Sequence, residues 1–264
     1  MAKISVLDSS PTGKVIAVTG GYGHLGKAIS ASLLKNGAIV YVAARNQEKF
    51  KNVFREELKT SEQQLRFLNC DINSSESIAN AFEELIKIEG KLDGLINNAF
   101  GARGQSPYEM PRADFNYTLD GSLASVFDVI KFAIPHLSEG ASIVNVSSMY
   151  GMVAPDFKAY KDSPEYLNPP HYGAAKAGVI QLSRYYASLL GEKGVRVNAV
   201  SPGPFPSEPI QKNETFMKEL RNRTLLGRYG LPEELAGIFT FLMSDSAKFI
   251  TGQNFAIDGG WTVR

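Results

Sequence analysis

Two side chains that could move a proton stand four positions apart in the stretch HYGAAK, residues 171–176. Residues i and i+4 are neighbours on one face of a helix, so Tyr172 and Lys176 are expected side by side. A phenol has a pKa near ~10, and a nearby positive charge lowers that pKa, so the pair could supply a general acid or base. The residues between them are small, which would let a flat ligand come close. The alternative is a buried tyrosine and a lysine reaching solvent along an amphipathic helix.

A second chemical pattern is the glycine-rich segment TGGYGHLG, residues 19–26, which follows an apolar run and opens a segment with helical apolar spacing. Glycines in that context let the backbone approach a pyrophosphate at the positively polarised end of a helix. A tight strand-to-helix turn is the alternative, but the strand before and the helix after favour a dinucleotide site.

The end of the next apolar run bears on which dinucleotide binds. An acidic residue there would bind the ribose hydroxyl of NAD, whereas an arginine can hold the 2′-phosphate of NADP. The run ends VAARN, with Arg45 and no carboxylate, so NADP is favoured over NAD. The alternative is that Arg45 simply caps a strand at the protein surface.

These residues must be positioned by strands and helices that alternate along the chain. Strands are predicted within KVIAVTGG, AIVYVAAR, QLRFLNCDI, LDGLINNAF, SIVNVSS, VRVNAVSPG and NFAIDGG. Helices are predicted between them, including a polar helix to about residue 60 and helices at 111–138, 172–193 and 232–244. Strict alternation predicts an α/β fold, a doubly wound parallel sheet of about seven strands with helices on both faces. A single domain over residues 1–264 is expected.

Two irregular segments, residues 154–170 and 202–213, each follow a predicted strand and are rich in proline and aromatic or charged residues. Ligands in parallel sheets bind at the carboxyl ends of strands. We therefore expect both segments to form walls of a substrate pocket.

Composition narrows the classes of function. The 264 residues are 44% hydrophobic and 21% charged, which is ordinary for a globular protein. A formal net charge of +1 provides no basic field for nucleic acid or an anionic membrane. Three histidines and one cysteine, Cys70, make a metal centre or a disulfide framework unexpected and fit a reducing compartment. The N-terminal stretch has no long apolar run, so we expect a cytoplasmic protein without a signal peptide or membrane anchor.

Taken in order, the motifs resemble those of the short-chain dehydrogenase/reductase family in its single-domain form. The resemblance covers residues 14–264 and rests on TGGYGHLG, CDI, INNAFG, IVNVSS, YGAAK, RVNAVSPG and ITGQNFAIDGG. It implies a Rossmann fold and an oxidoreductase that transfers hydride between a nicotinamide and a carbonyl or secondary alcohol. It also implies a small-molecule substrate and a homodimer or homotetramer, with segments 111–138 and 172–193 at the interface.

The resemblance assigns roles to single residues. Ser148 would hydrogen-bond the substrate oxygen, Tyr172 would be the general acid or base, and Lys176 would bind the ribose and lower the pKa of the tyrosine. Asp71 would contact the adenine, and the alternative role for this residue is to cap a helix. The alternative for Ser148 is that it is simply a hydroxyl at the end of a strand. The expected cofactor-binding residues are Gly20, Tyr22, His24, Leu25, Arg45, Asp71, Ile72, Asn98, Ala99, Phe100, Tyr172, Lys176, Pro202, Gly203, Phe205 and Ser207.

Two departures from the family pattern concern single positions. His24 stands where a glycine is usual, so its side chain either touches the cofactor or points away from it. The register of the 111–138 helix places Ser122 where the family has a catalytic asparagine, whose main chain supports a water path to the lysine. Asn116 lies too early in the helix to replace it.

A third departure is the separation of Ser148 and Tyr172, which lie 24 residues apart, further than the family pattern has them. The extra residues would loop out, and we expect them to recognise substrate rather than to form a solvated surface loop. The side chains offered to a polar substrate would be Tyr160, Lys161, Tyr166 and His171.

Two classes of function remain open at this point. The first is an NADP-dependent alcohol dehydrogenase or carbonyl reductase. The wording SSMYGMVAPDF resembles a subset of the family linked to bacterial surface-sugar and flagellin-glycan biosynthesis, which favours a sugar-derived substrate. The competing class is a non-catalytic NAD(P)-binding protein that senses redox state, suggested by His24 and Ser122. The intact pair of Tyr172 and Lys176 favours the enzyme.

Overall fold

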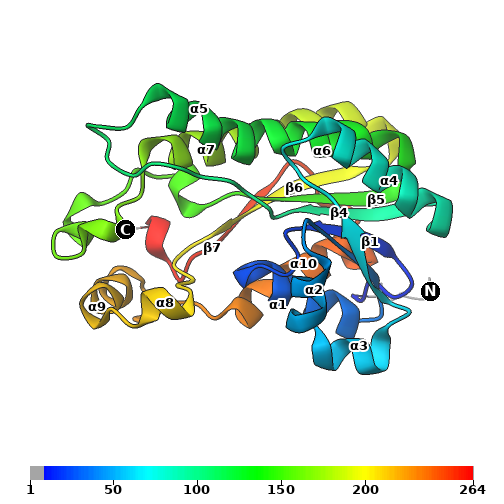
Figure 1. The fold of residues 1–264 in the computed structure, drawn as a ribbon, viewed down its shortest axis with the longest axis horizontal. Coiled ribbons are helices and arrows are strands. Elements are labelled where there is room, and N and C mark those ends of the chain that lie inside the picture. Colours follow the sequence, from blue (N-terminus) through cyan, green and yellow to red (C-terminus); the bar gives the residue numbers. More distant parts are fainter. Residues whose placement is uncertain (1–8, 264) are drawn as a thin grey trace, which may run out of the picture.

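Seven parallel strands form one central sheet, as predicted (Figure 1). The computed structural model describes residues 9–263. The strand order is β3-β2-β1-β4-β5-β6-β7, so the direction of winding reverses between β1 and β4, where doubly wound sheets bind their ligands. The strands are β1 (Val15–Thr19), β2 (Ile39–Ala44), β3 (Leu65–Asn69), β4 (Leu92–Asn97), β5 (Leu137–Val146), β6 (Arg196–Pro202) and β7 (Asn254–Ile257).

Helices cover both faces of the sheet (Figure 1). One face carries α4 (Ser75–Glu89), α5 (Arg112–Leu119), α6 (Ser125–Ala133) and α7 (Pro170–Leu190). The other carries α1 (His24–Lys35), α2 (Gln47–Val53), α3 (Arg55–Ser61) and α10 (Pro232–Met243). Two further helices, α8 (Glu208–Gln211) and α9 (Glu214–Arg223), follow β6. Short helical turns are η1 (Asp120–Ala124), η2 (Ile134–His136), η3 (Met149–Gly151), η4 (Phe157–Tyr160), η5 (Pro164–Tyr166), η6 (Gly191–Lys193), η7 (Asp245–Ala247) and η8 (Trp261–Val263).

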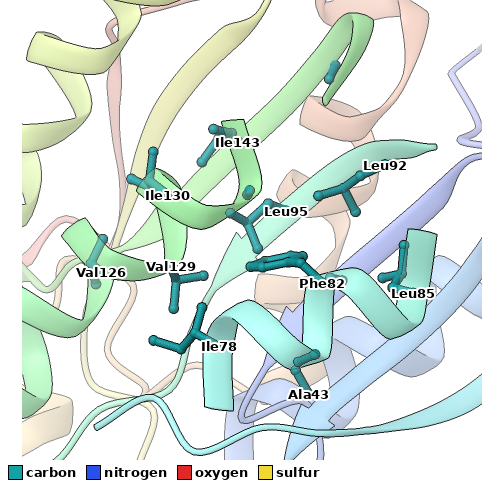
Figure 2. Close-up of a cluster of buried hydrophobic side chains, with 14 of the residues drawn as sticks. Ala43, Ile78, Phe82, Leu85, Leu92, Leu95, Val126, Val129, Ile130 and Ile143 are labelled. Atoms are coloured by element: carbon teal, nitrogen blue, oxygen red, sulfur yellow. The ribbon is translucent and has the colours of Figure 1, made fainter. Parts of the chain in front are cut away.

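The packing of α4 and α6 against the sheet shows how the helical pattern becomes a core (Figure 2). On α4, Ile78, Phe82 and Leu85 recur at helical spacing and are at most 4% exposed. They meet the apolar face of α6 and, on β4, Leu95. Apolar side chains at this spacing form one stripe of a helix, which must be buried against a neighbouring layer. This packing holds the sheet rigid, so the residues that follow the ends of its strands have fixed positions.

The helix predicted at 111–138 is interrupted by a wider, π-helical turn, η1. Gly101 comes close to this turn: its N–H donates to the Gly121 carbonyl at 3.0 Å, and a Cβ on Gly121 would lie 3.1 Å from the Gly101 Cα. Such single turns are frequent at functional sites and leave no trace in apolar periodicity. The polar helix after β2 is likewise split into α2 and α3 at Phe54, which is fully buried.

Within the part of the chain that the structure describes, no helix combines the length and apolar character needed to cross a membrane.

Candidate active site

A cavity of about 630 Å³ runs along the carboxyl ends of the strands. The sheet order decides its layout, because residues after β3 and β2 line one half, whereas residues after β4, β5 and β6 line the other. We call these the nucleotide half and the catalytic half. Its volume is typical of a small-molecule or cofactor site. All the residues predicted to be catalytic or cofactor-binding line this cavity.

The glycine-rich turn sits at the boundary between the two halves. Gly20 adopts a left-handed conformation (φ +62°), and a Cβ on Gly26 would lie only 2.2 Å from the Gly20 carbonyl oxygen. Asn98 fixes the turn, since its Nδ2 donates to the carbonyls of Thr19 and Gly20, both at 3.1 Å. The first turn of α1 therefore faces the cavity, and no side chain caps its N–H groups. This is a cradle that a pyrophosphate would fit.

His24 connects the two sides of the cavity. Its Nε2 lies 3.1 Å from the carbonyl oxygen of Phe205, in the segment after β6. Because a carbonyl only accepts, Nε2 must carry the proton. The imidazole therefore joins the start of α1 to the segment after β6, and the residue lines the cavity although it is exposed. A contact of His24 with the cofactor stays a prediction.

The nucleotide half carries the exposed side chain of Arg45. Near it, the Lys49 ammonium lies 5.3 Å from the centroid of the Tyr22 ring. Asp71 accepts a hydrogen bond from the Asn73 N–H at 3.0 Å, while the side chain that caps α4 is Ser74. Asp71 therefore does not cap this helix.

Cys70 also lines the nucleotide half. Burial, reinforced by the charge of Asp71, raises the pKa of its thiol to about 12. The thiol is therefore protonated at neutral pH and a poor nucleophile.

The catalytic half brings Ser148, Tyr172 and Lys176 together. Lys176 is 3% exposed, donates from Nζ to the Val146 carbonyl at 2.8 Å, and lies 5.8 Å from the centroid of the Tyr172 ring. Burial lowers the pKa of Lys176 to about 8. Burial also raises the pKa of Tyr172, and a hydrogen bond with Ser148 opposes that rise. Among the protein groups alone, desolvation of the phenol therefore outweighs the expected lowering of its pKa.

The small residues between tyrosine and lysine have a different role from the one expected. A Cβ on Gly173 would lie 2.9 Å from the Tyr150 carbonyl oxygen, and Ala175 is fully buried. A Cβ on Gly151 would lie 2.7 Å from the Lys176 carbonyl carbon. Small side chains here let α7 pack against η3, and none of residues 173–175 lines the cavity.

Ser122 is fully buried in η1, and its Oγ donates to the Gly101 carbonyl at 2.8 Å. The hydroxyl therefore holds the segment after β4 against the helix. Asn116 is exposed on α5.

Residues 154–170 and His171 contribute nothing to the lining of the cavity, although a substrate wall was predicted there. Tyr160 is buried, with its hydroxyl 2.5 Å from that of Tyr150, and Tyr166 stacks on Phe216 at 4.6 Å between ring centroids. His171 is fully buried and donates from Nε2 to the Arg103 carbonyl at 2.6 Å. These three side chains turn inward because aromatic partners and a backbone acceptor are available there, so they are not offered to a ligand in this cavity. Lys161, the fourth side chain predicted to meet substrate, is exposed and lies outside the lining.

The inserted segment instead ties two neighbouring segments together. Gln105, in the segment after β4, donates to the carbonyls of Glu165 and Leu167. On the other side, Asn213 donates to the Glu165 carboxylate at 3.1 Å, and Arg223 of α9 pairs with Asp156 at 3.1 Å.

Further lining residues were not named one by one from the sequence. Ile210 lies in segment 202–213, which was predicted as a wall of the pocket and contributes five residues to the lining. Tyr117 belongs to α5, where an aromatic residue normally indicates core, and no sequence signal separates it from core residues. The others are Gly23, Ala43, Ala44, Cys70, Asn73, Gly101, Val146 and Ser147.

Comparison with known proteins gives consistent matches over nearly the whole chain. A family model described as enoyl-(acyl carrier protein) reductase matches residues 23–262. The chain is 32% identical to a 3-oxoacyl-(acyl-carrier-protein) reductase of Thermotoga maritima over 257 residues, covering 95% of this chain and 98% of that protein. It is 31% identical to a 7alpha-hydroxysteroid dehydrogenase of Bacteroides fragilis, covering 95% of each chain.

Solved structures give the same result for the fold. A short-chain type dehydrogenase/reductase from Mycobacterium marinum matches with a TM-score of 0.84 at 26% identity, covering 97% of this chain and 98% of that one. Pseudomonas aeruginosa RhlG in complex with NADP matches with a TM-score of 0.87 at 27% identity, over 98% and 100% of the two chains. A short-chain dehydrogenase from Leptospira borgpetersenii with bound NAD+ matches with a TM-score of 0.84 at 26% identity, over 99% of each.

Proposed function

The chain belongs to the short-chain dehydrogenase/reductase family, and from that membership we propose how this NAD(P)-dependent oxidoreductase works. It interconverts a carbonyl and a secondary alcohol, with Tyr172 as the general acid or base. The observation that carries this proposal is the meeting of Ser148, Tyr172 and Lys176 in one cavity beside the glycine-rich turn.

Bound nicotinamide would supply or accept the hydride. Ser148 would hydrogen-bond the substrate oxygen and hold it beside the phenol. Tyr172 would give that oxygen a proton during reduction and take it back during oxidation. Lys176, charged below its pKa of about 8, would favour the ionised form of the phenol and bind ribose hydroxyls.

NADP is the proposed cofactor, because the nucleotide half offers Arg45 and has no carboxylate at the end of β2. Isothermal titration with NADP⁺ and NAD⁺ tests this. We expect NADP⁺ to bind at least tenfold tighter, about 1.4 kcal/mol, and Arg45→Ala to remove most of that difference. Arg55→Ala, an exposed arginine on α3 outside the cavity, is the matched control. Equal affinities in the unaltered protein would contradict the proposal.

Turnover is tested by NADPH consumption with a panel of carbonyl compounds. Protein that binds NADPH but reduces none of them would support the binding-only alternative, which the assembled catalytic residues do not favour. The sugar-derived substrate suggested by the sequence stays a prediction that this panel includes.

We also propose that the protein forms a homodimer or homotetramer through the outer faces of α6 and α7. Phe127, Tyr185 and Leu189 are 44%, 60% and 53% exposed there. Large apolar side chains gathered on an outer face commonly mark an interface.

A further inference from the structure

The catalytic half of the cavity has aromatic and aliphatic walls. Phe100, Tyr117, Phe205 and Ile210 come to it from four different segments: the one after β4, α5, the one after β6, and α8. Of these four side chains, Phe100 is the one with measured contacts to catalytic residues. Its ring lies edge-on to the Tyr172 ring at 6.1 Å between centroids, and the Lys176 ammonium is 5.5 Å from its centroid.

Phe100 keeps 57% of its surface exposed although it stands beside the buried Lys176 and the partly buried Tyr172. A ligand that covers this apolar surface removes it from water, which stabilises the complex in proportion to the apolar area covered. The segment that carries it is held by the hydrogen bonds of Gly101 to Gly121 and of Arg103 to His171, so the ring has a fixed support.

The polar side chains around the catalytic half are mostly engaged already. Asn98 donates to the glycine-rich turn, Ser147 donates to the Lys176 carbonyl, and His24 donates to the Phe205 carbonyl. Among the described residues that line the cavity, Arg45 and Asp71 belong to the nucleotide half.

That leaves few side-chain partners for a polar substrate. Ser148 and Tyr172 serve the reacting oxygen, so the side-chain hydroxyls still available in the described lining of this half are those of Ser207 and Tyr117. The hydroxyl of Tyr22 belongs to the glycine-rich turn at the boundary of the two halves. A sugar would bring more hydroxyls than these two groups can satisfy, and each unsatisfied buried group costs free energy. Among the described lining residues of this half, Lys176 is the one cation with which a phosphate or carboxylate could pair. The exposed Arg103 lies outside that lining, with its guanidinium 3.7 Å from the centroid of the Tyr117 ring.

We propose that the substrate is a carbonyl compound with an apolar flank, and that Phe100 is the side chain that selects it. The inference rests on the proposed oxidoreductase function and names the substrate class of the same site. It differs from the sugar-derived substrate suggested by the sequence.

A matched pair of ketones tests the substrate class. Cyclohexanone and pentahydroxycyclohexanone share the ring and the reacting carbonyl and differ in hydroxyl groups. With NADPH in excess, we expect kcat/KM for cyclohexanone to exceed that for the pentahydroxy compound by at least tenfold. Alkyl substituents at C4 should raise kcat/KM by about fourfold for each buried methylene. A higher kcat/KM for the pentahydroxy compound would overturn the proposal.

Binding separates failure of this inference from failure of the proposed function. If neither these ketones nor any compound of the wider carbonyl panel consumes NADPH, the oxidoreductase proposal is what fails. Isothermal titration of 4-phenylcyclohexanone and of pentahydroxycyclohexanone into the protein saturated with NADPH, and into Tyr172→Phe treated alike, still decides the substrate class. Tighter binding of 4-phenylcyclohexanone than of the pentahydroxy ring supports an apolar slot, and the reverse order, or no binding of the phenyl compound, contradicts it.

Variants of Phe100 test the selecting residue. Phe100→Ala should lower the ratio of kcat/KM for 4-phenylcyclohexanone over cyclohexanone by about tenfold, and Phe100→Leu should restore part of it. Phe157→Ala is the matched control, because Phe157 is 61% exposed and does not line the cavity. An unchanged ratio in Phe100→Ala would show that the ring does not select substrate.

Discussion

Tyr172 is the single side chain on which the proposed proton transfer depends. Tyr172→Phe keeps the ring and its edge-on contact with Phe100 but removes the transferable proton. We expect kcat to fall by about 10²–10⁴-fold while NADP⁺ affinity stays within a few-fold. Steady-state assays and isothermal titration measure the two quantities. Tyr108→Phe, at a position 95% exposed, is the control, and a Tyr172→Phe variant with undiminished kcat would remove the tyrosine from the mechanism.

From the lowered pKa of Lys176 we predict how cofactor binding depends on pH. Burial lowers its pKa to about 8, so the ammonium loses its charge as pH rises through that value. An anionic dinucleotide favours the charged form, and binding above pH ~8 should therefore take up a proton and weaken with rising pH. Titration of NADP⁺ at pH 7 and pH 9.5, in buffers of different ionisation enthalpy, measures both effects. Lys176→Met should bind more weakly at pH 7 and show a smaller change; an equally steep profile in this variant would assign the effect to another group.

At the scale of whole elements, the hydrogen bond from His24 to Phe205 joins α1 to the segment after β6 across the cavity. We expect this contact to slow the release of a cofactor that lies between the two elements. His24→Leu should raise the dissociation rate of NADPH about fivefold, the worth of one hydrogen bond of ~1 kcal/mol. His24→Gln retains an N–H donor and should restore slow release. Stopped-flow fluorescence gives both rates, and equal rates for the two variants would show that the hydrogen bond does not retain the cofactor.

The C-terminus of α10 depends on a buried cation. Arg196, 6% exposed, donates from Nη2 to the Leu242 carbonyl at 2.8 Å, and burial lowers the pKa of its guanidinium. Cations favour the C-terminal end of a helix, where carbonyls have no partner within the helix. Arg196→Met should lower the free energy of unfolding by about 1.5–3 kcal/mol, measured in urea at one protein concentration.

Lys248→Met is the control for that prediction. Lys248 is exposed and pairs with Asp245 at 2.8 Å, a surface pair worth at most ~1 kcal/mol. If both variants lost equal stability, the carbonyl contacts of Arg196 would not be the cause.

The elements differ in how much of them the sequence could predict. Strands and long helices followed from apolar periodicity, because burial of one face is imposed by the layers around it. The π-helical turn η1 was not predicted, since one extra residue in a turn leaves no trace in apolar periodicity, and its contact with Gly101 is between residues distant in the sequence. Contacts between residues distant in the sequence also limited the prediction of the site. The glycine-rich motif was enough to predict that Gly20 and its neighbours lie at the cavity. The inward turn of Tyr160, in contrast, depends on partners far away in the sequence, such as Phe216.

For the whole molecule, the proposed oligomer predicts what a charge on the outer face of α7 would do. Tyr185→Glu places a carboxylate on a residue that is 60% exposed and proposed to be covered. Burying an unpaired charge is costly, so light scattering after size exclusion should show smaller species. Ile88→Glu on α4, 56% exposed in the unaltered protein, should leave the mass unchanged. A change of mass with Ile88→Glu alone would place the interface elsewhere.

The ties made by residues 154–170 have a consequence for how this protein could be recombined with its relatives. One segment grips both the stretch after β4, through Gln105, and α9, through Asp156 and Arg223. A chimera that imported α8 and α9 alone would bring them in without the carboxylates and aromatic rings they rest on. The three segments are therefore expected to be exchanged, and inherited, as one block.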